Sequence, residues 1–182
     1  MERIKIIPTT DHDLPLIVRV HRSAFNSNIE ADLTFNLLKD DTATPVVSLL
    51  AFKNNVAIGH ILFTKVEFKS RRKSPVMHLL APLAVVSEYQ NQGVGSMLIR
   101  AGIEKLRLLN TKLVFVLGHI DYYPQFGFIR DANRFGFKAP YPIPNEVADA
   151  WMVQELVDGA IENYKGEIAC AISLDKEEYW RE

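Results

Sequence analysis

The sequence lacks several features that mark special classes of protein. It holds one cysteine, Cys170, so no disulfide can form within the chain. No apolar run reaches the roughly 18 residues that a transmembrane helix needs. The first residues also lack the apolar core of a signal peptide. We therefore expect a cytoplasmic protein that does not insert into a membrane.

A strong excess of charge of either sign is also missing. The formal net charge is −1, and hydrophobic residues make up 48% of the 182 residues. This balance argues against disorder and gives no reason to expect nucleic acid as a partner. The length favours a single domain over residues 1–182. The basic run Arg71-Arg72-Lys73 is expected to lie in a solvated loop.

Groups for metal binding or covalent catalysis are scarce. The histidines, at positions 12, 21, 60, 78 and 119, show no paired ligand spacing, and one cysteine cannot build a thiolate cluster. Cys170 lies within the apolar run 168–172, which predicts a buried and unreactive thiol. No Gly-x-Ser-x-Gly elbow occurs, which argues against a serine hydrolase. We expect no metal ion in this protein.

Hydrophobic periodicity predicts the order of the elements. The expected helices cover residues 14–25, 30–39, 92–109 and, as a short one, 120–126. The expected strands cover residues 3–7, 46–53, 56–67, 76–86, 113–117, 151–157 and 167–173. Asn54-Asn55, between two strand-like runs, predicts a hairpin of antiparallel strands. The strand, helix and strand from 76 to 117 form a βαβ-type unit.

The turn before the helix at 92–109 has the properties of a phosphate-binding element. The first N–H groups of a helix lack internal partners, and the helix dipole is positive there. Gly93 and Gly95 would let an anion approach this backbone. A Walker A loop is excluded because Gly-Lys-Ser/Thr does not follow Gly95. A dinucleotide fingerprint is excluded because position 98 is Leu98.

Leu83-Ala84-Val85 is followed by Gln90, Gly93 and Gly95, and residues 83–96 as a whole resemble the cofactor-binding motif of the GNAT superfamily of N-acetyltransferases. In that motif a Leu-Ala-Val strand precedes Gln/Arg-x-x-Gly-x-Gly/Ala, and Ser87 stands here where the family often has proline. The resemblance implies that main-chain groups near Val85 bind the pantetheine arm of acetyl-CoA and that the turn binds its pyrophosphate. The implied cofactor-binding residues are Leu83, Ala84, Val85, Gln90, Asn91, Gln92, Gly93, Val94, Gly95 and Ser96.

A second match lies at Tyr122-Tyr123-Pro124-Gln125-Phe126-Gly127-Phe128, which resembles the Phe-Tyr-x-x-x-Gly-Phe signature of the same family. The resemblance implies that Tyr123 protonates the departing thiolate of the cofactor. A phenol with a pKa of about 10 can donate a proton to a thiolate whose conjugate acid has a pKa of about 8.5. The alternative is that Tyr123 only packs among aromatic residues, which is the role expected of Tyr122.

A neutral amine is also needed, so some group must accept the proton of the ammonium form. His119 follows the strand at 113–117 and is a candidate base, with a cofactor contact or a surface residue as the alternatives. His60 and His78, inside strand-like runs, are expected to be structural. Glu30 lies where many family members bind the acceptor, although a helix first-turn charge explains it equally well.

The resemblance implies an α/β fold with a central mixed, mostly antiparallel sheet flanked by helices. The strands at 76–86 and 112–118 should splay apart to admit the pantetheine, and the motif-bearing core spans 76–130. The implied activity is transfer of an acetyl group from acetyl-CoA to a primary amine of an unidentified acceptor by direct attack. The alternative is a non-catalytic acyl-CoA-binding sensor or interaction module. Dimers are common in the superfamily, so a homodimer is one expected form.

Overall fold

The protein is built around one twisted sheet that is covered by helices on both faces. The computed structural model describes residues 2–70 and 72–181. Within these residues the main run of the sheet has the order β1-β2-β3-β4-β5-β7. The strands are β1 (Lys5–Pro8), β2 (Val47–Lys53), β3 (Val56–Phe68), β4 (Met77–Val85), β5 (Leu113–Leu117) and β7 (Trp151–Glu155).

The pairing of these strands is mixed and mostly antiparallel. Along the main run only β4 and β5 pair in parallel, because a crossover helix connects them. The two short strands β6 (Phe137–Lys138) and β8 (Gly166–Ala169) pair with each other, and β8 extends the far end of β3. The predicted fold class is therefore confirmed.

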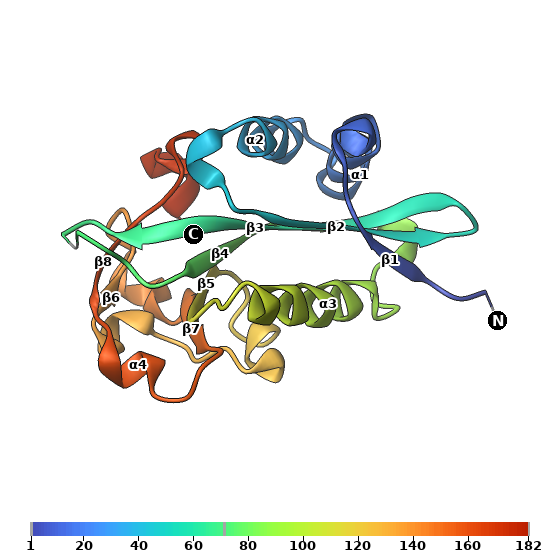
Figure 1. Cartoon of the computed structure of the whole chain (residues 1–182). Coiled ribbons are helices and arrows are strands. Elements are labelled where there is room, and N and C mark those ends of the chain that lie inside the picture. The colour runs from blue at the N-terminus through green and yellow to red at the C-terminus, as the bar shows by residue number, and fades with distance from the viewer. Residues whose placement is uncertain (1, 71, 182) are drawn as a thin grey trace.

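Helices form one layer on each side of the sheet (Figure 1). Helices α1 (Leu14–Phe25) and α2 (Ile29–Leu38) lie on one face, and α3 (Val94–Leu108) lies on the other. Each helix turns an apolar stripe to the sheet, as the spacing of its apolar residues predicts. The buried stripe of α3 consists of Val94, Leu98, Ile99, Gly102, Ile103 and Leu106. The N-terminal two thirds of the chain thus forms three layers.

The predicted elements up to residue 117 are confirmed within two residues at each end. Later predictions are less accurate. The segment 120–126 is not a helix throughout, since a single 3-10 turn covers only Tyr123–Phe126. The last strand ends at Ala169 rather than at residue 173, because Ile172–Leu174 forms a 3-10 turn. Periodicity also gives no sign of the short helix α4 (Ala160–Asn163) or of strand β6.

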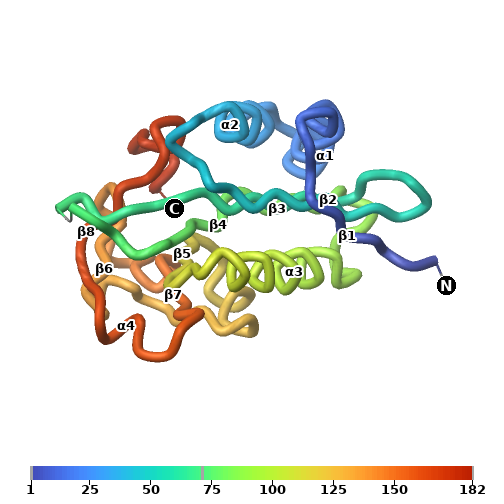
Figure 2. The backbone as a smooth tube through the Cα atoms, in the orientation of Figure 1, coloured from blue at the N-terminus to red at the C-terminus, as the bar shows by residue number. Residues whose placement is uncertain are grey.

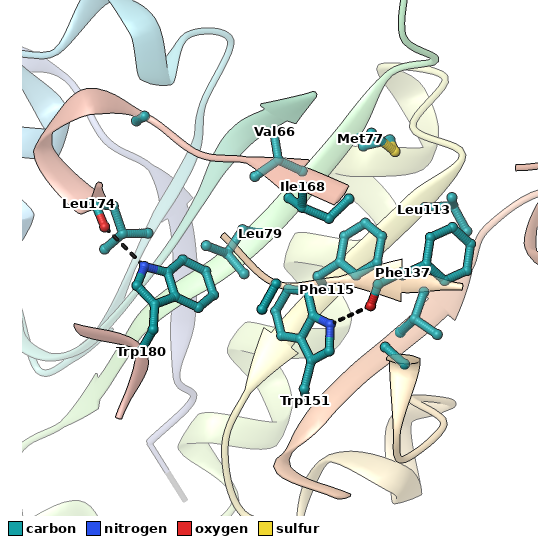
Figure 3. Close-up of a cluster of buried hydrophobic side chains, with 14 of the residues drawn as sticks. Val66, Met77, Leu79, Leu113, Phe115, Phe137, Trp151, Ile168, Leu174 and Trp180 are labelled. Atoms are coloured by element: carbon teal, nitrogen blue, oxygen red, sulfur yellow. Dashed lines mark hydrogen bonds between the residues drawn. The ribbon is translucent and has the colours of Figure 1, made fainter. Parts of the chain in front are cut away.

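The C-terminal part of the chain is held by an aromatic core (Figure 3). Trp151 stacks on Phe115 at 5.3 Å between ring centroids, and its Nε1 donates to the carbonyl of Phe137 at 2.9 Å. Trp180 meets the edge of Trp151 and donates to the carbonyl of Leu174 at 3.1 Å. Both indoles are buried with their N–H groups satisfied, which is the condition for burying tryptophan at little cost.

The last residues return to the N-terminal helices, as the red segment beside α2 shows in Figure 2. The backbone N–H of Ser173 donates to Asp40 Oδ2 and that of Ile172 to Thr42 Oγ1, both at 2.9 Å. Residues far apart in the sequence are therefore joined by hydrogen bonds at this end of the molecule.

Two smaller predictions concern single sites. Cys170 is partly buried, and burial raises the pKa of its thiol to about 12, which keeps it in the unreactive thiol form. Arg72 and Lys73 are exposed, while Arg71 lies outside the described residues. None of the helices in the described part of the chain is both long and apolar enough to span a bilayer.

Candidate cofactor-binding site

Strand β4 changes partners along its length. Its first half pairs with β5, from Met77 opposite Leu113 to Leu80 opposite Val116. Its second half keeps only β3 as a neighbour, with Ala84 opposite His60 and Val85 opposite Gly59. The strands β4 and β5 thus part after Leu80, in the region where the family resemblance implies that they splay.

An irregularity in β4 coincides with this parting. Ile61 of β3 lies opposite Leu83 and Phe63 lies opposite Leu80, so β4 holds one residue more than β3 between these pairs. Such a bulge bends a strand and strengthens its local twist. Pro82 lies within it and has no N–H to offer a neighbouring strand. The bulge therefore directs the last residues of β4 away from β5.

The main-chain groups of the parted segment can be assigned from the ladder. The N–H of Val86 donates to Ile58 of β3 at 2.9 Å. Because the direction alternates along an antiparallel strand, the N–H of Val85 points away from β3, toward the side that β5 has left. The carbonyl of Val85 on that side accepts a bond from Gln90 Nε2 at 2.9 Å. The backbone N–H of Val85 therefore points toward the place where β4 and β5 separate.

The turn between β4 and α3 is fastened by its own side chains. Gln90 binds the carbonyl of Val85, and Gln92 Nε2 donates to the carbonyl of Glu88 at 2.8 Å. Asn91 and Gly93 both have left-handed backbones, with φ of 58° and 83°. A Cβ on Gly93 would meet nothing within 4 Å, so its conformation, not crowding, favours glycine there. Gly93, directly before α3, therefore borders open space.

Gly95, in the first turn of α3, has a different reason to be glycine. A Cβ at this position would lie 2.6 Å from Tyr122 Oη and 3.7 Å from Leu83 Cδ2. The hydroxyl of Tyr122 therefore rests against the first turn of α3. The sequence alone indicates only a packing aromatic at Tyr122, and no local signal relates it to a residue 27 positions earlier.

Tyr123 lies next to this group and is largely buried. Its side chain is 8% exposed and packs on Phe128 and on the ring of Tyr122. A Cβ on Gly118 would lie 2.5 Å from Tyr123 Cε2, so glycine makes room for the ring where β5 ends. The two predicted elements, the turn at 90–96 and the signature at 122–128, are thus brought together at the parting of β4 and β5.

The segment that carries both tyrosines is tied down at several points. The carbonyl of His119 accepts the N–H of Tyr122 at 3.1 Å. Arg130 donates from Nε to the carbonyl of Ile120 at 2.8 Å and pairs with Asp121 at 3.0 Å. His119 itself is exposed just beyond the end of β5.

A chain of buried polar groups lies on the opposite face of the sheet, under α1. His60 Nε2 is 2.8 Å from Ser48 Oγ, and His60 Nδ1 is 2.8 Å from His21 Nε2. Thr9 Oγ1 donates to Ser48 Oγ at 2.7 Å. Both rings are fully buried. Burial lowers the pKa of His21 to about 4, and burial and the neighbouring His21 lower the pKa of His60 well below its usual value.

The structure also shows the surroundings of His78 and Glu30, which the sequence analysis considered as site residues. His78 is buried between the carbonyl of Pro45 and Thr111 Oγ1, and burial lowers its pKa, although the bond to Pro45 opposes this. Glu30 lies in the first turn of α2, with its Oε2 atom buried and without a hydrogen-bond partner among the described residues. Among these residues there is also no group of three or more His, Cys, Asp or Glu side chains that could hold a metal ion.

Two features indicate the class of the protein. Strands β4 and β5 separate, and backbone groups line the start of α3 beside them. A family model for the acetyltransferase (GNAT) family matches residues 15–128. The chain therefore belongs to this family, and it is an acyltransferase. It is 50% identical to the N-acetyltransferase YjhQ of Escherichia coli over 163 residues, which cover 90% of each protein.

Solved structures agree with this assignment. The crystal structure of the GNAT family N-acetyltransferase YhbS from Escherichia coli, in complex with CoA, superimposes with a TM-score of 0.86 at 26% identity. The alignment covers 97% of this chain and 94% of that one. A GNAT family acetyltransferase from Brucella melitensis, solved with acetyl-CoA, has the same fold with a TM-score of 0.74 at 22% identity, covering 96% of this chain and 100% of that one.

Proposed function

We propose that this protein transfers the acetyl group of acetyl-CoA to a primary amine by direct attack. The observation that carries the proposal is the position of the turn at 86–93. It follows the segment of β4 that no longer pairs with β5, and it begins directly after Val85, whose backbone N–H points away from β3. The presence of CoA and acetyl-CoA in the solved relatives supports the same cofactor for this chain.

The proposed binding mode uses main-chain groups almost throughout. The N–H groups from Asn91 to Ser96 face the diphosphate at the positive end of the α3 dipole. Leu83, Ala84 and Val85 run beside the pantetheine arm, which takes the place of the missing neighbour strand. The side chains of Gln90 and Gln92 act indirectly, since they hold the turn together through bonds to Val85 and Glu88.

The proposed chemistry needs no covalent enzyme intermediate. The neutral amine attacks the thioester carbonyl, and the N–H of Val85 stabilises the oxyanion of the tetrahedral intermediate. Collapse of this intermediate breaks the carbon–sulfur bond, and Tyr123 gives its proton to the departing thiolate. His119, exposed at the end of β5, is the candidate that takes the proton from the amine.

Calorimetric titration with acetyl-CoA tests the binding mode. Asn91→Asp adds a negative charge at the turn without changing the shape of the side chain, and its φ of 58° suits aspartate. We expect the Kd to rise about tenfold, because the added charge opposes the diphosphate at short range. Asn110→Asp is the matched control, since Asn110 has a φ of 61° beyond the other end of α3. Equal Kd values for both variants would count against the site.

Steady-state kinetics with an amine acceptor test the role of Tyr123. Loss of a general acid lowers kcat about 100-fold or more, and we expect Tyr123→Phe to do so with the Kd for acetyl-CoA unchanged. Phe128→Leu, which alters the packing beside Tyr123 and leaves the hydroxyl, should keep most of the turnover. If Tyr123→Phe retains turnover within about twofold of the wild type, the ring serves only packing.

A further inference from the structure

The hydroxyl of Tyr122 occupies an unusual place beside the cofactor turn. It lies 2.6 Å from the position that a Cβ on Gly95 would take. The ring is held edge-on by Tyr123 and Phe126, each at 5.2 Å between centroids. Arg130 fixes the preceding loop through Ile120 and Asp121. The position of the hydroxyl is therefore imposed by packing on several sides.

This hydroxyl is also a donor that the protein itself does not use. Among the described residues no side chain or carbonyl pairs with Tyr122 Oη, and the residue is only partly buried. An ordinary packing position would be filled as well by phenylalanine. A phenol there places an O–H beside the first turn of α3, where backbone N–H groups also lack partners within the helix.

We propose that Tyr122 binds the cofactor, with Oη donating a hydrogen bond to a diphosphate oxygen at the start of α3. The proposal rests on the proposed use of acetyl-CoA and adds a side-chain donor to a site otherwise built from backbone. A hydrogen bond to a charged oxygen is stronger than one between neutral groups. Gly95 is then glycine because it must admit this hydroxyl, in addition to leaving space for the ligand.

Titration of the full-length protein separates this proposal from the proposed function. We expect Tyr122→Phe to raise the Kd for acetyl-CoA about tenfold, as for loss of one charge-assisted bond. The Kd for 3′-phospho-ADP, which carries the diphosphate without the pantetheine arm, should rise by the same factor. Tyr141→Phe is the control, because its hydroxyl bonds the Asp175 carbonyl outside the site.

Each result has a defined meaning. Binding by the wild type together with unchanged Kd values for Tyr122→Phe would overturn the role of Tyr122 and leave the proposed function intact. A rise in the Kd of Tyr122→Phe for acetyl-CoA but not for 3′-phospho-ADP would also overturn it, since the hydroxyl would then contact the pantetheine arm and not the diphosphate. Absence of acetyl-CoA binding by the folded wild type would overturn the proposed function and this proposal with it.

A double-mutant cycle on stability tests the geometry independently of any ligand. Gly95→Ala places a methyl group 2.6 Å from Tyr122 Oη, so the single variant should melt at a lower temperature than the wild type. In the Tyr122→Phe background the nearest atoms are at 3.7 and 3.8 Å, which is ordinary contact, and most of the lost melting temperature should return. The affinity for acetyl-CoA should not return. If adding Tyr122→Phe fails to restore stability to the Gly95→Ala protein, the contact is refuted.

Discussion

Two clusters of polar groups, on opposite faces of the sheet at β4, differ in how they form hydrogen bonds. On the α3 face, side chains of the turn at 86–93 bond to the carbonyls of Val85 and Glu88, and the Tyr122 hydroxyl has no hydrogen-bond partner among the described residues. The first backbone N–H groups of α3 have no partner within the helix. On the α1 face, His21, His60, Ser48 and Thr9 form an unbroken chain of bonds from 2.7 to 2.8 Å, and both histidines are fully buried. His60 of the second cluster lies opposite Ala84 of β4 in the sheet.

The difference indicates what each group contributes. Donors left open at a helix start cost stability unless a ligand or water binds them, so they are expected where an anion binds. Buried polar groups that pair with one another fix a unique packing, and breaking one link leaves its neighbours unsatisfied. We therefore expect substitutions in the turn to change cofactor affinity and substitutions in the histidine chain to change the stability of the fold.

His60→Leu should have the largest effect on stability. It leaves both Ser48 Oγ and His21 Nε2 without their bonds to the central ring, at about 1 to 3 kcal/mol for each buried polar group. We expect the free energy of unfolding in urea to fall by about 3 kcal/mol, with the Kd for acetyl-CoA unchanged. His12→Leu, at an exposed position, should change stability by less than about 0.5 kcal/mol. A strong change in the Kd of a folded His60→Leu protein would show that the histidine chain also affects cofactor affinity, against this expectation.

Acid should destabilise the protein through the same chain. Below pH 6.5 the unfolded histidines bind protons, whereas the folded His21, with a pKa of about 4, does not until the pH nears that value. The unfolded state then binds more protons, so stability is full above pH 6.5 and falls as the pH drops toward 4. At about 1.4 kcal/mol per pKa unit, His21 alone accounts for about 3 kcal/mol.

Urea unfolding at a series of pH values measures this loss. His60 adds to it in the same direction, and so does His78, whose pKa burial also lowers. Burial opposes the lowering of the Asp40 pKa, but bonds from Thr42 and Ser173 outweigh it and bring the value to about 2, so Asp40 titrates below this window. In a His21→Phe/His60→Leu variant the slope between pH 6.5 and 4 should flatten, and an unchanged slope would assign the loss to other groups.

The sequence predicted best what is determined locally. Helix α1 has the predicted bounds, and Asn54 and Asn55 both adopt left-handed conformations, with φ of 51° and 61°, in the hairpin that their spacing indicated. The separation of β4 and β5 could also be predicted, but only from the family motif at 83–96, because periodicity alone does not indicate it.

The missed features all depend on contacts between distant residues. The bond between His21 and His60 joins positions 39 apart, and neither residue differs locally from any other helix or strand histidine. Strand β6 has only two residues and exists because β8 lies beside it. The hydroxyl of Tyr122 became part of the candidate site only when folding brought it against Gly95. Such pairings are set by tertiary packing and leave no periodic signal.

The smallest effect that we expect concerns the two glutamines of the turn, Gln90 and Gln92. Gln90→Ala removes the bond to the Val85 carbonyl, at the strand end whose N–H we propose to face the cofactor. A net loss of about 0.5 to 1.5 kcal/mol should appear as a rise of about twofold to twelvefold in the Kd for acetyl-CoA. Gln92→Ala removes a similar exposed bond, to Glu88, and should change the Kd less because Glu88 is farther along the chain from β4. Calorimetry on both variants decides the point, since equal effects would mean that the glutamines steady the turn as a whole and not Val85 in particular.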